Sequence, residues 1–132
     1  MKNYLNYINN NFNKDYDNSN YDAYEGYIRG NMFKNLYDPY IKNEPYDIRP
    51  MNEQAELITY IDSLCFAMID LGLYLDVNPN DMEAIKLYNK YRKEKDEYTK
   101  KYESKYGPLT LDSDSLERYP WAWINMPWPW DN

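Results

Sequence analysis

Apolar residues are concentrated in the second half of the chain, where two long segments follow the period of an α-helix. In the first segment, from about 52 to 76, they recur at spacings of three and four, as one face of a helix requires. The residues on this face are Leu57, Ile61, Leu64, Met68, Leu71 and Leu75. We expect them to form the seam of a helix–helix contact, with Asn52 as the N-cap of the helix.

The opposite side of the same predicted helix is also apolar. Phe66, Ile69 and Leu73 lie there, flanked by Asp62 and Asp70. A helix that is apolar on two faces is normally covered on both, and one antiparallel neighbour covers only one of them. The sequence leaves three candidates for the second cover: the C-terminal tail, the N-terminal segment or another protein. We predict that this side is a protein–protein interface.

The second periodic segment, from about 79 to 106, is amphipathic. Asn78 is a suitable N-cap and Pro79 a suitable first helical residue, while Gly107 followed by Pro108 ends the helix. The apolar stripe of this helix consists of Ala84, Leu87, Tyr88, Tyr91, Tyr98 and Tyr102. Because only a short turn joins the two helices, we predict an all-α fold built on a small antiparallel helical hairpin.

Less regular segments flank the hairpin. Residues 1–24 are rich in Asn, Asp and Tyr and offer little to bury, which predicts a mobile, largely irregular N-terminal arm. Residues 25–50 carry apolar anchors at mixed spacing and prolines that force an extended path, so we interpret them as a docking segment. This segment either wraps its own hairpin or inserts into another subunit. Residues 51–132 then form the helical domain and its tail.

All four tryptophans lie beyond both helices, in an extended tail rich in Trp and Pro, at Trp121, Trp123, Trp128 and Trp130. Prolines preset an extended backbone that presents large indoles at low entropic cost. The indoles either fold back over the hairpin or anchor a partner. We favour the first interpretation, because four exposed indoles would promote aggregation.

Composition narrows the function mainly by exclusion. The formal net charge of −7 disfavours nucleic acid, whose phosphates require Lys and Arg. The chain has no histidine, which excludes the usual zinc sites, the common catalytic triads and the Glu-x-x-His manganese sites of helical bundles. The single cysteine, Cys65, cannot form an internal disulfide and fits the role of a small buried side chain. Asp62 and Asp70 fit the rim of an interface better than acid/base chemistry. We therefore assign no catalytic residue, metal ligand or cofactor, and expect no enzyme.

The start of the chain and its apolar runs bear on its location. Residues 1–15 lack the continuous apolar core of a secretion signal. No run approaches the roughly 20 apolar residues of a membrane span. We expect a protein that is not secreted and has no membrane partner.

Several short motifs are more specific than the composition. YLDVNPND lies at the turn between the helices, YGPL at the end of the second helix, and PWPW near the end of the tail. In this order, over about 52 to 130, they resemble the CotJB family of bacterial spore-coat proteins. Upstream, EGYIRGNMFKNLYDPY (residues 25–40) resembles the segment that closes CotJA, the small coat protein associated with CotJB. CotJB proteins usually begin near the position of Asn52, so the first 50 residues depart from the family pattern.

This resemblance implies a structural component of the endospore coat, made in the mother cell and encoded beside a manganese-catalase-like coat protein, CotJC. The implied partners are that protein, other coat proteins and further copies of the chain itself. As partner-binding positions we predict Phe33, Leu36, Tyr37, Tyr40, Asp62, Phe66, Ile69, Asp70, Leu73, Trp128 and Trp130.

Two other functions remain open. NPNDMEAIKLYNKY resembles the start of a tetratricopeptide repeat and suggests a helical adaptor, although one copy is present and such arrays need about three. The chain could also be an accessory subunit that donates the carboxylate of Asp62 or Asp70 to a partner enzyme. A separate hypothesis concerns the tyrosines between Tyr4 and Tyr24, which either cross-link the arm to neighbouring subunits or reflect compositional drift.

Overall fold

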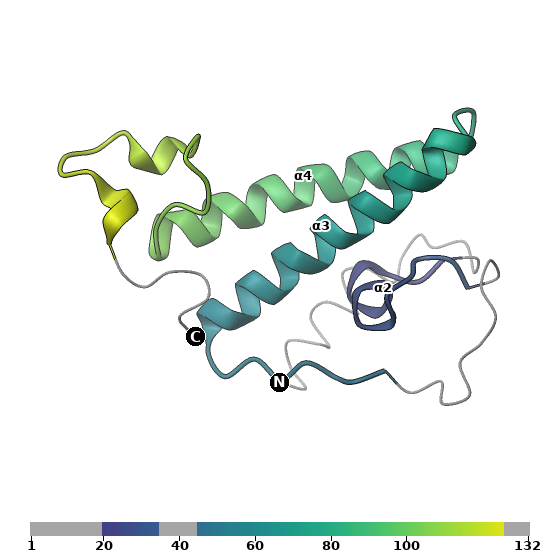
Figure 1. Cartoon of the computed structure of the whole chain (residues 1–132), viewed down its shortest axis with the longest axis horizontal. Helices are drawn as coiled ribbons and strands as arrows, with labels where there is room; N and C mark the ends of the chain where they lie inside the picture. Colours follow the sequence, from purple (N-terminus) through teal and green to yellow (C-terminus); the bar gives the residue numbers. More distant parts are fainter. Residues whose placement is uncertain (1–19, 35–44, 126–132) are drawn as a thin grey trace.

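The computed structural model describes residues 20–34 and 45–125, and these residues form helices without a β-strand. Two long antiparallel helices, α3 (Glu53–Val77) and α4 (Met82–Lys105), make a hairpin, and the short helix α2 (Ala23–Arg29) lies beside α3 (Figure 1). Two 3-10 helices, η1 (Asp114–Leu116) and η2 (Ala122–Ile124), follow α4. The prediction of an all-α fold built on a helical hairpin is confirmed.

The ends of α3 are set by two asparagines. The side chain of Asn52 accepts a hydrogen bond from the Ala55 N–H at 2.8 Å, so the predicted N-cap is confirmed. At the other end, the backbone N–H of Asn78 donates to the carbonyl oxygens of Leu75 and Tyr74. Its side-chain amide also donates to the Tyr74 carbonyl at 3.0 Å. Asn78 therefore closes α3.

For this reason the predicted start of the second helix was wrong: α4 begins at Met82, with Asp81 rather than Asn78 as its N-cap. The carboxylate of Asp81 accepts a hydrogen bond from the Ala84 N–H at 3.0 Å and a second from the Tyr74 hydroxyl at 2.9 Å. The predicted end is confirmed, because α4 stops at Lys105 and Gly107 adopts a φ of 123°, in the region that favours glycine.

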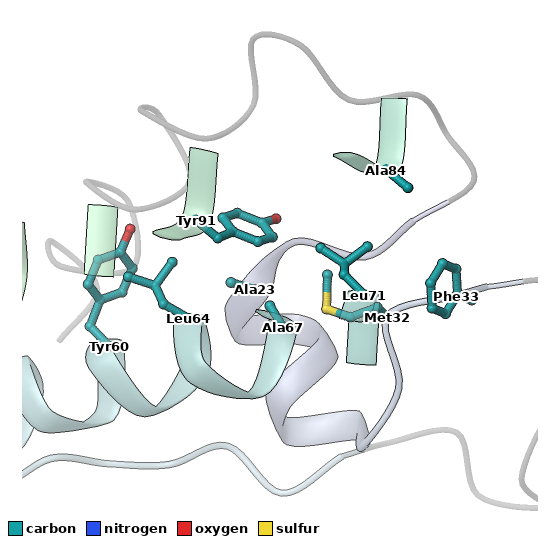
Figure 2. Packing of buried hydrophobic residues seen from close by; sticks show 9 residues of the cluster. All are labelled: Ala23, Met32, Phe33, Tyr60, Leu64, Ala67, Leu71, Ala84 and Tyr91. Carbon is teal, nitrogen blue, oxygen red and sulfur yellow. The ribbon is translucent and has the colours of Figure 1, made fainter. Parts of the chain in front are cut away.

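The predicted seam forms the core between α3 and α4. One cluster combines Leu64, Ala67 and Leu71 of α3 with Ala84 and Tyr91 of α4 (Figure 2). A smaller cluster of Leu57, Ile61 and Tyr102 lies nearer the start of α3. Aromatic rings reinforce the seam, since the rings of Tyr60 and Tyr98 meet edge to face with centroids 4.4 Å apart.

The sequence did not predict α2, whose residues it assigned to the end of an irregular arm and the start of an extended segment. Asp22 caps this helix by accepting a hydrogen bond from the Glu25 N–H at 2.8 Å, and Gly30 ends it with a φ of 75°. A helix of seven residues shows little periodicity and depends on tertiary packing for its stability. That packing is supplied by α3.

The N-terminal segment, defined here as residues 20–34, provides the second cover of α3. Ala23, Met32 and Phe33 are buried in the same cluster as Leu64 and Leu71 (Figure 2). Polar contacts fix this segment in place, because the carboxylate of Asp70 accepts a hydrogen bond from the Met32 N–H at 2.8 Å. This part of the predicted docking segment wraps its own hairpin.

Residues just before α3 are tied to α2 as well. The hydroxyl of Tyr24 donates to the carboxylate of Asp47 at 2.7 Å and accepts from the Ile48 N–H at 3.2 Å. Burial, followed by the hydrogen bond to Asp47, raises the pKa of Tyr24 well above its usual range. These contacts direct the chain back toward the start of α3.

The part of the tail that the structure describes lies beside the end of α4, away from α2 (Figure 1). Leu116 and Ala122 are buried there, and Trp123 is partly buried, whereas Trp121 is 52% exposed. Within residues 109–125, therefore, the indoles do not supply the second cover of α3.

The prediction that no segment is apolar enough to span a membrane was wrong for α3. Among the described helices, α3 is long and apolar enough to cross a membrane, although we expected no run to approach that composition. The core helix of a domain meets the same criteria, because it too is apolar on more than one side. In this structure α3 packs against both α4 and α2.

Candidate functional site

Helix α3 has three sides, and the structure covers two of them. We call the third side the outer face and define it by Asp62, Ile69, Gly72, Leu73 and Asp76, which the helical period places together. Ile69 and Leu73 at its centre are each 64% exposed. The outer face is therefore an apolar strip without a cover among the described residues.

Further apolar side chains are exposed at the turn of the hairpin, next to one end of the outer face. Val77 at the end of α3 is 78% exposed, and Met82 at the start of α4 is 66% exposed. Exposed apolar residues that occur singly need no explanation, but a cluster of them marks an interaction site. The exposed apolar surface of the hairpin thus gathers around the second half of α3.

Gly72 is the least expected residue of the outer face. A glycine inside a helix costs about 1 kcal/mol relative to alanine, so it usually has a structural reason. Gly26 in α2 has one, because a Cβ there would lie 2.3 Å from the Met32 Sδ. A Cβ on Gly72 would meet nothing within 4 Å. The described part of the fold thus gives no reason for a glycine at this position.

All charged side chains of α3 are negative, because the helix carries acidic residues and neither lysine nor arginine. Glu53 is paired with Lys105, and Asp70 binds the Met32 N–H. Asp62 and Asp76 are exposed and form no ion pair with a described residue. Partial desolvation nevertheless raises the pKa of the Asp62 carboxyl. Two carboxylates that form no ion pair with a described residue therefore lie on the outer face, one toward each end of its apolar centre.

The predicted partner-binding residues fall into three groups. Asp62, Ile69 and Leu73 lie on the outer face. Leu36, Tyr37, Tyr40, Trp128 and Trp130 lie outside the described residues.

Phe33, Phe66 and Asp70 form the third group, which is engaged within the chain itself. Phe33 is buried, with its ring centroid 4.7 Å from that of Tyr74. Phe66 is partly buried and lies 6.1 Å from the ring of Tyr27, so it belongs to the packing against the N-terminal segment. The helical period predicts Phe66 on the same face as Ile69 and Leu73, but the structure places Phe66 on the side of α3 that faces α2.

Sequence reasoning missed Gly72 and Asp76. A signal for Gly72 was present, since a glycine in the middle of an otherwise apolar helix lacks an obvious use. Asp76 follows Leu73 by three residues and Gly72 by four, which is the spacing of one helix face. Neither signal could indicate that this side of α3 remains uncovered.

Other reactive groups near the seam are engaged or shielded. Burial raises the pKa of the Cys65 thiol, which lowers its reactivity. Burial also raises the pKa of Glu94, whose carboxylate accepts a hydrogen bond from the Tyr60 hydroxyl at 3.4 Å. Within residues 20–34 and 45–125, no three or more His, Cys, Asp or Glu side chains are grouped so as to hold a metal ion. The chemistry available on the outer face is that of contact: apolar burial and ion pairing.

Comparison with known proteins identifies a family that the chain resembles over most of its length. The protein family described as CotJB protein matches residues 55–131, more than half of the chain. The matched range contains α4, η1, η2 and nearly all of α3, whereas α2 lies outside it. No curated protein and no solved structure matches the chain.

Proposed function

Because this chain belongs to the CotJB family and is therefore a spore coat protein, we propose that it acts in the coat as a non-catalytic assembly subunit. Its partner in this proposal is a manganese-catalase-like coat protein of the CotJC type, and other coat proteins bind around it. In this proposal the chain is synthesised in the mother cell and is not secreted.

The outer face of α3 is the observation that supports an assembly role. Ile69 and Leu73 remain 64% exposed although α4 and the N-terminal segment cover the other sides of the same helix. Fully burying one such side chain contributes about 1.5–3 kcal/mol, so a partner that covers both gains a substantial part of its binding energy. A helix held rigidly on two sides presents this surface at little entropic cost.

The non-catalytic part of the proposal follows from the chemistry of the residues. The chain lacks histidine, and its one cysteine has a thiol pKa raised by burial. Asp70, one of the two carboxylates that could serve a partner enzyme, binds a backbone N–H within the chain. These features support a subunit that binds rather than one that reacts.

Co-purification tests the proposal directly. The full chain carries an affinity tag and is co-expressed with the manganese-catalase-like coat protein of the same organism, and the complex is captured over a range of salt and pH. We expect the catalase-like protein to be retained by the tagged chain. Absence of retention under every condition would show that the assignment of this partner is wrong.

A matched pair of variants locates the contact. Leu73→Asp places a charge in the outer face, and Leu111→Asp places the same charge on a leucine of nearly equal exposure elsewhere, 65% against 64%. We expect loss of the complex with Leu73→Asp and its retention with Leu111→Asp. If both variants retain the catalase-like protein equally, the contact does not lie on the outer face of α3.

A further inference from the structure

The structure also indicates what kind of segment covers the outer face. On the basis of the proposed function, we propose that the occupant is an α-helix of the partner that carries lysine or arginine at both ends of an apolar stripe and crosses α3 at Gly72.

The dimensions of the outer face suit a helix. Asp62 and Asp76 are 14 positions apart, which corresponds to about 21 Å along α3 at a rise of 1.5 Å per residue. Ile69 and Leu73 lie between them on the same side. The surface is thus a narrow strip of about four turns, the shape that an amphipathic helix covers with its apolar stripe.

Charge determines which helix fits this strip. Covering the outer face removes water from Asp62 and Asp76, and a buried carboxylate without a cation is strongly unfavourable. Two cations of α4 pair with an acid of α4 itself, since Asp96 lies 3.5 Å from the Lys95 Nζ and 4.0 Å from an Arg92 guanidinium nitrogen. Since no described residue supplies a cation to Asp62 or Asp76, we assign the cations to the partner, near both ends of its apolar stripe.

A second copy of the chain does not meet this requirement through α3. In a two-fold arrangement of antiparallel α3 helices centred at Ile69, Asp62 of one copy faces Asp76 of the other. A parallel arrangement pairs each aspartate with itself. Both arrangements bring like charges together, and α3 has no lysine or arginine to separate them.

Gly72 would allow the backbone of the partner helix to approach the α3 backbone closely. With hydrogen in place of a side chain, the α3 backbone is open to a neighbouring helix at this position, and nothing in the described fold fills the space that a Cβ would take. A larger side chain at Gly72 is therefore tolerated by the free chain and obstructs the partner.

Two sets of variants of the full chain test the proposal. Asp62→Lys/Asp76→Lys reverses the charge of the outer face, and Glu97→Lys/Glu117→Lys makes the same change in net charge at two exposed positions elsewhere. Gly72→Leu adds a side chain to the crossing point, and its thermal unfolding midpoint serves as its control. Each variant is titrated with the purified catalase-like protein in low salt.

We expect a loss of affinity of at least about tenfold for the outer-face charge reversal, and of less than about threefold for its control. For Gly72→Leu we expect a similar loss of affinity, with an unfolding midpoint that is unchanged or higher because leucine is the better helix former. Binding that is insensitive to both outer-face changes would overturn the inference while leaving the proposed function intact.

Two designed helices of about 21 residues test the inference without that partner. They share one Leu/Ala stripe and carry either lysine or glutamate at both ends of that stripe. We expect the chain to bind the lysine helix, and Asp62→Lys/Asp76→Lys to prefer the glutamate helix. If the lysine helix binds and the catalase-like protein does not, the inference stands and the proposed function fails. Equal binding of both helices would overturn the inference. So would a self-association of the chain that Gly72→Leu abolishes, because the outer face would then belong to a second copy.

Discussion

Replacing Met32 with alanine is the sharpest test of how this domain is held together. Met32 has no exposed surface and packs with Leu64 and Leu71 in the main core cluster. Its backbone N–H donates to Asp70, and alanine keeps that hydrogen bond. The substitution therefore removes side-chain packing and little else.

The size of the effect follows from what is removed. Alanine lacks the Cγ, Sδ and Cε atoms of methionine, and a buried methylene contributes about 0.8 kcal/mol of transfer free energy. The cavity left behind adds to this cost, so buried Met→Ala changes typically fall between about 2 and 5 kcal/mol. We expect the free energy of unfolding to fall by about 3 kcal/mol, a large part of the 5–15 kcal/mol typical of a domain.

Guanidinium chloride unfolding followed by far-ultraviolet circular dichroism measures this change. Met51→Ala is the matched control, because Met51 is 94% exposed and its replacement should change the unfolding free energy by no more than about 0.5 kcal/mol. Hydrogen exchange at the residue 32 amide should accelerate in the first variant only. If both variants unfold at the same denaturant concentration and residue 32 keeps its protection, the N-terminal segment is not part of the core and the reasoning is refuted.

Three further changes test local features of the fold. Gly26→Ala places a Cβ 2.3 Å from the Met32 Sδ, so we expect a loss of about 1–3 kcal/mol in the same unfolding assay, and an unchanged midpoint would contradict this packing. Asp81→Ala removes the N-cap of α4 and should lower stability by about 1 kcal/mol. Hydrogen bonds from the backbone and from Tyr74 lower the pKa of Asp81 in the folded state. Its contribution to stability is therefore present above pH 3.8 and is lost as the pH falls through the lower folded pKa. A stability difference between variant and parent that persists in strong acid would contradict this reasoning. Glu94→Gln tests a pKa shift in the opposite direction. Burial raises the pKa of Glu94, so the folded state prefers the protonated form of this side chain. That preference stabilises the fold below pH 4.5 and is lost as the pH rises through the folded pKa, so thermal unfolding should show the glutamine variant gaining on the parent toward about pH 7, and a constant difference across pH would argue against it.

The hairpin could be predicted from the sequence because its signals are local. The spacing of Leu57, Leu64 and Leu71 defines one face of a helix whatever surrounds it, and Asn52 lies where an N-cap belongs. The start of α4 was less certain, because Asn78 and Asp81 are both good caps and sequence alone cannot assign Asn78 to the end of α3. Helix α2 escaped prediction because its seven residues gain their stability from a helix far along the chain.

The parts of the candidate site that depend on distant contacts could not be predicted from local patterns. The exposure of Ile69 and Leu73 agrees with the prediction that one helix cannot bury both sides of α3. Periodicity could not show that Phe66 faces α2, since that contact depends on a segment about 40 residues away. The hydrogen bond from the Met32 N–H to Asp70 joins residues 38 positions apart, and no short-range sequence pattern predicts it.

The N-terminal segment covers α3 from outside the family match, which begins at residue 55. Leu64, Ala67 and Leu71 belong to the matched range, whereas Ala23, Met32 and Phe33, which pack on them, do not. Because both parts belong to one chain, this association is intramolecular and does not depend on the protein concentration. Each copy of the chain thus carries its own cover in a fixed one-to-one ratio, and its core stays covered however dilute the protein is.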